Sequence, residues 1–154
     1  MVESTALEMR HASTGIEGST PSPSANTKIK MQIPKQQFEK LVAEAIDEVP
    51  EKFREWINNL VFFVEDYPTD EQLKKVHLSG RSGVTLLGLY EGHHQAKRLN
   101  VGPVFPDRIT LFQKPLEQMC RTEEELKKQI TSTVRHEIAH HFGSDEAGAR
   151  KAGR

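Results

Sequence analysis

The sequence predicts an α+β domain. Three short runs rich in β-branched and aromatic residues indicate strands at 60–65, 85–90 and 108–112. Two longer segments, one before and one after these runs, repeat apolar residues with the helical period. Three strands cannot close a barrel, but they can form a small sheet on which two helices pack. We therefore expect a small three-stranded sheet packed with an N-terminal helix and a C-terminal helix.

The chain has 154 residues, which is enough for one domain, and 36% of them are apolar. The first 30 or so residues are rich in Ser, Thr, Gly, Pro and Ala and show no apolar period. This composition offers little surface to bury, so it favours disorder. We assign residues 1–32 to a disordered N-terminal tail and residues 33–154 to the folded domain.

The first predicted helix follows Pro34 and is closed by Pro50. Its core-facing residues fall at helical spacing, and they are Phe38, Leu41, Val42, Ala45, Ile46 and Val49. A short helical turn with Phe53 and Trp56 comes next. The run Leu60–Glu65 then has the composition of a buried strand, which Asp66-Tyr67-Pro68 ends.

Thr69 and Gln72 stand at capping-box spacing and predict a turn of helix that runs to Val76. A turn rich in Gly and Ser at 79–83 leads into the second strand. The second and third predicted strands are Thr85–Tyr90 and Arg108–Phe112, the latter bounded by Pro106 and Pro115.

The last predicted helix begins at Thr122, which stands at capping-box spacing from Glu125. An apolar stripe with the helical period follows at Leu126, Ile130, Val134 and Ile138. Gly143 can adopt a positive φ, so the helix is expected to end there and the chain to turn back.

The stretch His136-Glu137-Ile138-Ala139-His140 is the most informative part of the chain. Residues four apart on a helix lie one turn above each other, so His136 and His140 can reach the same metal ion. Glu137 is carried toward a water bound to that ion. The pattern predicts a zinc hydrolase with one Zn²⁺ per chain and Glu137 as the catalytic residue. The plainer alternative is an amphipathic helix with two surface histidines.

A third zinc ligand is expected after the glycine turn. In the pattern H-E-x-x-H-x-x-G-x-x-ligand, that position is Glu146. Asp145 remains an alternative, because the tightness of the turn cannot be read from the sequence. Three protein ligands with one position left to water is the catalytic rather than the structural arrangement of zinc.

Four longer motifs occur in order along the chain: VEDYP at 64–68, LLGLYEG at 86–92, PDRITLF at 106–112 and TVRHEIAHHFG at 133–143. In these motifs the chain resembles the small bacterial zincin-like metallopeptidases, or minimal zincins. The resemblance spans about Phe38 to Gly153. It implies a minimal zincin-like fold with a mixed sheet beside the motif helix, zinc held by His136 and His140, and Glu137 as the catalytic acid, and it leaves the substrate open.

Two positions depart from the pattern of this family. Relatives usually carry Asp where this chain has Glu146, and they often carry apolar residues or proline where it has HHQAKR at 93–98. A second metal site on His93 and His94 is conceivable, but adjacent side chains rarely aim at one ion. A solvated loop is the favoured interpretation.

The hydrolysis of a peptide also needs a donor to the oxyanion, and an edge on which an extended substrate can bind as an added strand. Tyr90, His141 and Arg98 are candidates for the donor by chemistry alone. Two other functions stay open: a metal-binding regulatory or interaction module without significant proteolysis, and zinc-dependent hydrolysis of a non-peptide amide. The presence of Glu137 favours a hydrolase, because a structural zinc site needs no base.

Composition narrows the partners. The formal net charge of −1 argues against nucleic acid, which requires a basic surface. No run approaches the roughly 20 apolar residues of a membrane span, and no signal-peptide pattern is present. Cys120 is the single cysteine and favours a reducing compartment. We expect a cytoplasmic protein, monomeric or weakly oligomeric, that acts on a peptide or protein substrate.

Overall fold

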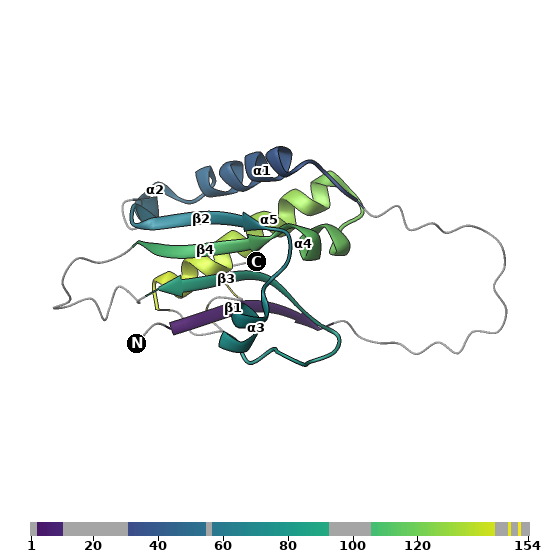
Figure 1. Cartoon of the computed structure of the whole chain (residues 1–154). Coiled ribbons are helices and arrows are strands. Elements are labelled where there is room, and N and C mark those ends of the chain that lie inside the picture. Colours follow the sequence, from purple (N-terminus) through teal and green to yellow (C-terminus); the bar gives the residue numbers. More distant parts are fainter. Residues whose placement is uncertain are drawn as a thin grey trace.

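A four-stranded mixed sheet forms the centre of the molecule, with strand order β1-β3-β4-β2 (Figure 1). The computed structural model describes residues 3–10, 31–54, 57–92, 106–143, 148 and 151, and the side chains among them from residue 31 onward. β3 is antiparallel to both β1 and β4, whereas β4 is parallel to β2. The strands are β1 (Glu3–Arg10), β2 (Leu60–Glu65), β3 (Val84–Gly92) and β4 (Asp107–Phe112).

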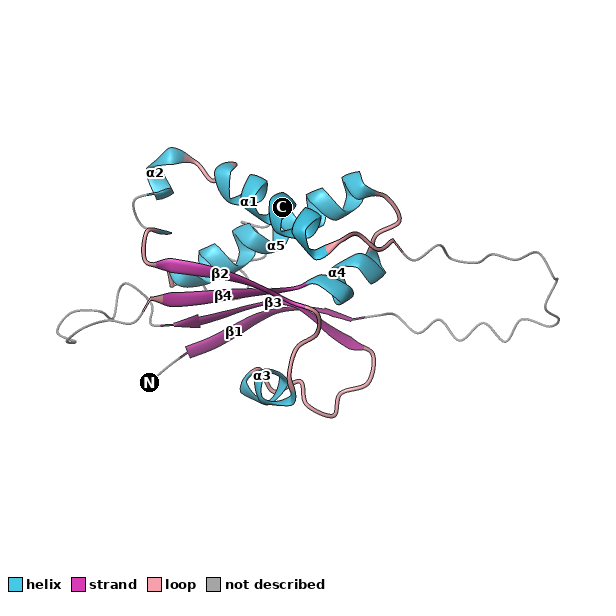
Figure 2. Cartoon of the chain, turned by 45° about the horizontal axis from the view of Figure 1, so that its top comes forward, coloured by secondary structure: helices cyan, strands magenta, loops and turns pink. Residues whose placement is uncertain are grey.

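Helices cover both faces of this sheet unequally, as Figure 2 shows. The larger ones lie together on one face and α3 lies on the other. The helices are α1 (Lys35–Asp47), α2 (Glu51–Arg54), α3 (Asp70–Lys75), α4 (Gln113–Met119) and α5 (Glu123–His141). The predicted α+β class and mixed sheet are confirmed. Among the described helices, none has the length and apolar content needed to span a membrane.

The strand β1 corrects one expectation. Residues 1–32 were predicted to be a disordered tail, but Glu3–Arg10 pairs along β3 and adds a fourth strand to the three predicted ones. The local sequence carries a weak two-residue alternation, with Thr5, Leu7 and Met9 separated by small or charged residues. The strand forms because β3 offers a free row of backbone donors and acceptors far away in the sequence.

The strand β2 corrects a second expectation. Its bounds agree with the predicted run, but it lies at the edge of the sheet rather than inside it. Val61 and Phe63 are 38% and 42% exposed. The guanidinium of Arg108 lies 4.3 Å from the centre of the Phe63 ring and covers part of it. An apolar run indicates a strand, but it does not say which face or neighbour the strand will have.

The helix α4 was not predicted, because Pro115 was taken as the end of a strand region. The helix begins at Gln113, so Pro115 lies in its first turn. The backbone N–H groups of a first turn have no partner within the helix, and proline is tolerated there for that reason.

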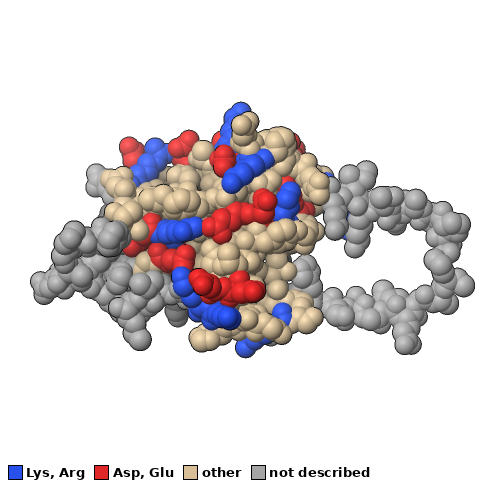
Figure 3. All heavy atoms as spheres, in the orientation of Figure 1, with Lys and Arg blue, Asp and Glu red and all other residues tan. Residues whose placement is uncertain are grey.

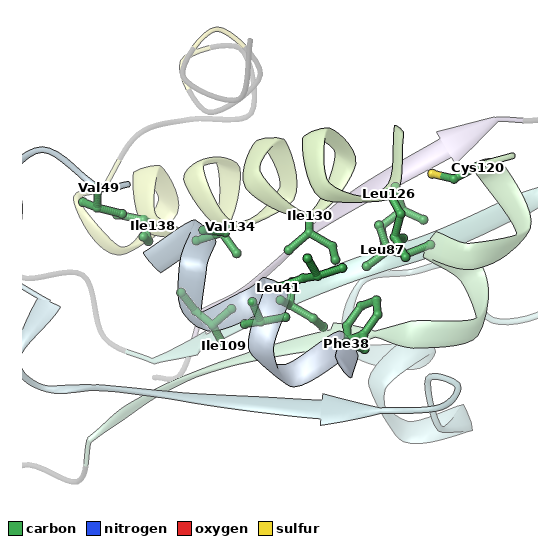
Figure 4. Packing of buried hydrophobic residues seen from close by; sticks show 14 of the residues in the cluster. Phe38, Leu41, Val49, Leu87, Ile109, Cys120, Leu126, Ile130, Val134 and Ile138 are labelled. Carbon is green, nitrogen blue, oxygen red and sulfur yellow. The ribbon is translucent and has the colours of Figure 1, made fainter. Parts of the chain in front are cut away.

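The main core lies between the sheet and helices α1, α4 and α5 (Figure 4). Phe38 and Leu41 of α1 point toward α5, whose apolar stripe faces them. Leu87 of β3 and Ile109 of β4 close the core from the sheet side, and both are fully buried. A smaller apolar cluster packs on the opposite face of the sheet, and it contains Leu78, Leu86, Leu89 and Phe112 with Leu73, Val76 and Val84.

The surface carries acidic and basic side chains close to one another on the face shown in Figure 3. Two ion pairs link elements of the domain: Lys75 of α3 binds Glu91 of β3, and Arg108 of β4 binds Glu65 of β2 at 2.6 Å. Exposed pairs of this kind contribute little to stability. The face shown in Figure 3 therefore has no broad area of only positive or only negative charge.

Candidate metal centre

The helix α5 carries the histidine motif and is fixed at both ends. The Thr122 hydroxyl accepts a hydrogen bond from the Glu125 backbone N–H at 3.1 Å. The Glu125 carboxylate accepts one from the N–H of Arg121 at 2.7 Å, one residue earlier than in a reciprocal capping box. At the other end, Gly143 has a φ of 82°, the predicted positive value. The helix therefore begins and ends where the sequence indicated.

The apolar stripe of α5 holds the motif against the sheet. Leu126, Ile130 and Val134 are fully buried, and Ile138 is 5% exposed. Figure 4 shows these side chains directed at α1 and the strands. The polar residues of the motif are buried as well: His136 and His140 are each 1% exposed and Glu137 is fully buried. The plainer alternative, an amphipathic helix with two surface histidines, is therefore excluded.

The two histidines present their Nε2 atoms to each other. These nitrogens lie 3.2 Å apart, and the ring planes are inclined at 75°. Two nitrogens that bind one tetrahedral zinc ion at about 2.0–2.1 Å stand roughly 3.3 Å apart, so the observed separation fits a shared ion. The donor set of two imidazoles also suits zinc. The geometry of His136 and His140 therefore fits the predicted metal.

Glu137 lies against Gly88, in the middle of β3. A Cβ atom added at Gly88 would stand 3.1 Å from the Glu137 Oε1 atom and 2.8 Å from the Cγ2 of Thr133. A glycine is therefore required for α5 to approach the strand this closely. The absence of a side chain at Gly88 thus lets the Glu137 carboxylate pack directly against the backbone of β3.

A β-bulge beside Gly88 directs two consecutive residues toward α5. Leu7 of β1 pairs with Gly88, but the next residue, Glu8, pairs with Leu86. Leu87 is thus the extra residue of the bulge. Its side chain joins the core beneath α5, on the side of the sheet where Thr133 and Glu137 pack against Gly88. Because of the bulge, Leu87 and Gly88 both face α5, although they are consecutive residues of one strand.

A buried polar cluster ties the end of α5 to the sheet. His141 Nδ1 lies 2.8 Å from the Asp107 Oδ2 atom, and the Tyr90 hydroxyl donates to the same oxygen at 2.8 Å. All three residues are at most 2% exposed. A Cβ at Gly92 would stand 2.4 Å from the Asp107 Cγ atom, so a second glycine makes room for this carboxylate. The cluster joins β3, β4 and α5 one residue after His140.

These contacts bear on the predicted oxyanion donors. Tyr90 and His141 both bind Asp107 inside the domain, which supports a structural role for them. Arg98, His93 and His94 lie outside the described residues. The same holds for Glu146 and Asp145, the two candidates for the third ligand. Within the described part of the chain, no three His, Cys, Asp or Glu residues form a metal-binding group.

Sequence reasoning overlooked two residues of this region, Gly88 and Asp107. A glycine inside a strand pattern is a recognised sign of close backbone approach, so Gly88 carried a usable signal. Asp107 carried none, because an acid beside Pro106 at a strand end is ordinarily solvated. Only the pairing of β3 with β4 brings Asp107 beside Tyr90 and His141.

A family model described as zincin-like metallopeptidase matches residues 57–152. The match covers more than half of the 154 residues and includes the motif, β3, β4 and the Asp107 cluster. The curated proteins contain no match to the chain. The chain belongs to the zincin-like metallopeptidase family, which indicates a zinc-dependent hydrolase. Strand β1 and helix α1 lie outside the matched residues.

Proposed function

We propose that this member of the zincin-like metallopeptidase family cleaves peptide bonds with one zinc ion per chain. The observation that carries the proposal is the convergence of the His136 and His140 Nε2 atoms at 3.2 Å, with the buried Glu137 next to His136 in α5. His136 and His140 would hold the metal. Glu146 would be the third ligand, with Asp145 as its alternative, and one position would stay open to water.

Zinc in such a site lowers the pKa of a coordinated water toward about 7 and polarises a substrate carbonyl. Glu137 is suited to the proton transfers that remain. Its carboxylate would accept a proton from the water that attacks the peptide carbonyl, and return that proton to the leaving amine as the C–N bond breaks. Its place one residue after His136 keeps it beside the reacting water without making it a ligand.

The expected partner is a peptide or protein, and the expected working form is a monomer or weak oligomer in the cytoplasm. Cys120 supports a reducing compartment, because it is a free and buried thiol. The mixed charges on the face shown in Figure 3 and the net charge of −1 speak against nucleic acid as a partner.

Metal content tests the ligand assignment. The purified wild-type chain should hold about one zinc, and His136→Ala and His140→Ala should each lose most of it, because two remaining ligands hold zinc weakly. His77→Asn is a matched control: His77 lies outside the motif at a φ of 58°, which asparagine tolerates. Elemental analysis that finds unchanged zinc in both motif variants would rule out this site.

The third ligand is tested in the same assay. Glu146→Ala should weaken zinc binding far more than Asp145→Ala, because only one of two adjacent carboxylates can comfortably face the ion. The reverse order would assign the ligand to Asp145. Equal small losses would mean that the third ligand lies elsewhere in the chain.

A further inference from the structure

Strand β1 lies on the sheet edge nearest to Glu137. Figure 1 shows it as the outermost strand, beside β3. Leu7 pairs directly with Gly88, the residue that Glu137 packs against. Neighbouring strands are about 4.8 Å apart. The β1 backbone therefore runs at about this distance from Gly88, against which Glu137 packs. Helix α5 also packs against β1.

An extended peptide that reaches Glu137 would need the same edge. Peptides bind sheets by adding a strand, with backbone hydrogen bonds that accept many sequences. β3 has two neighbours: β4 fills one side and β1 fills the other. In this arrangement Glu137 is fully buried and the motif histidines are each 1% exposed, so a substrate carbonyl cannot reach them.

Strand β1 pairs with a partner that lies far along the sequence. No hairpin joins it to β3, because the pairing of Glu3–Arg10 bridges more than seventy positions of sequence. It precedes residues 57–152, which match the family. Its sequence, ESTALEMR, includes the charged residues Glu3, Glu8 and Arg10, and its backbone pairs with β3 from Glu3 to Arg10.

We propose that residues 3–10 occupy, within the same chain, the β3 edge at which an extended peptide substrate pairs, and that β1 must leave for substrate to bind. This inference rests on the proposed peptidase function. A tethered strand competes at an effective concentration on the order of mM, so it raises the concentration of peptide needed for binding. The strand therefore acts as an internal competitor.

Two full-length variants shift β1 in opposite directions. In Ser4→Cys/Glu91→Cys the two residues pair directly, and opposed Cα atoms at about 4.5–5.5 Å suit a disulfide that locks β1 in place. In Thr5→Pro/Ala6→Pro, adjacent residues point their N–H groups to opposite sides, so one proline removes a hydrogen bond to β3. Ser13→Pro/Thr14→Pro, outside β1, is the matched control.

The probe is a fluorescein-labelled peptide with the sequence ESTALEMR, added to each protein in a Glu137→Gln background. Fluorescence anisotropy should show at least tenfold tighter binding to the proline variant than to the unaltered strand or the control. The oxidised lock should show no binding, and a reductant should restore it. Equal binding to all proteins would overturn the inference, as would a lock that forms only between two chains.

Hydrolysis of a mixed-sequence fluorogenic peptide library separates this inference from the proposed function. With Glu137 present, cleavage should be fastest in the proline variant and reversibly lost in the oxidised lock. Cleavage that the lock leaves unchanged would overturn the role of β1 and leave the peptidase intact. If the labelled peptide binds the proline variant most tightly and the oxidised lock not at all, but no protein cleaves the library, the competing role of β1 would be supported and the peptidase function contradicted.

Discussion

At the scale of single residues, Gly88 decides how closely the motif helix approaches the sheet. Gly88→Ala should cost about 1–3 kcal/mol of unfolding free energy, because its Cβ would stand 2.8 Å from the Thr133 Cγ2 atom. Adding Thr133→Ser removes that methyl group and keeps the hydroxyl bonded to the Gln129 carbonyl. The double variant should regain part of the loss in a urea titration. A single variant as stable as wild type would contradict this packing.

Cys120 gives a second prediction, about pH. Burial raises the pKa of its thiol from 9.0 to about 11, with a smaller contribution from the negative charge of Glu125. The thiolate is the reactive form, so a disulfide exchange reagent at pH 8 should react about a hundredfold more slowly with the folded chain than with the chain in urea. Cys120→Ser, which has no thiol, is the control for reaction at other groups. Equal rates would show an accessible, ionised thiol.

The same pKa sets a stability trend. Below about pH 9 the thiol is protonated in both states, and the folded chain has its full stability. As pH rises from 9.0 toward about 11, the unfolded chain loses this proton before the folded chain does, so the folded state is progressively destabilised. Cys120→Ala should lessen the decline seen in urea titrations across that range, and an unchanged slope would contradict it.

At the scale of elements, the Asp107 cluster joins β3, β4 and α5. Tyr90→Phe removes a donor to a buried carboxylate and should cost about 1–3 kcal/mol. A double-mutant cycle with Asp107→Asn should give a coupling of about 1 kcal/mol or more, since both groups share one hydrogen bond. Tyr67→Phe is the control, because Tyr67 is 56% exposed and should change stability by less than about 0.5 kcal/mol. Additive losses would contradict the coupling.

The elements differ in how well the sequence predicts them. Helix α5 and the turn of α3 could be predicted, because capping residues and helical spacing are local signals: Thr69 and Gln72 form the expected reciprocal capping box. The edge position of β2 could not be predicted, because Val61 and Phe63 look like core residues until the strand order is known. Strand β1 could not either, because its partner lies far along the chain and its own alternation is weak.

At the scale of the whole molecule, the sequence predicts the motif but not the arrangement that buries it. The spacing of His136 and His140 requires only helical geometry, so their convergence follows from local rules. The close approach at Gly88 and the anchor at Asp107 depend on the sheet register, which no local pattern states. The third ligand, Glu146 or Asp145, stays a prediction.

Catalysis by Glu137 is the central claim, and one comparison tests it most directly. Wild-type chain and Glu137→Gln, each carrying about one zinc, are assayed on the same fluorogenic peptide library. The amide keeps the shape of the side chain and removes the base, so cleavage should fall about a hundredfold or more while zinc content and melting temperature stay the same. Cleavage by Glu137→Gln at the wild-type rate would contradict the mechanism.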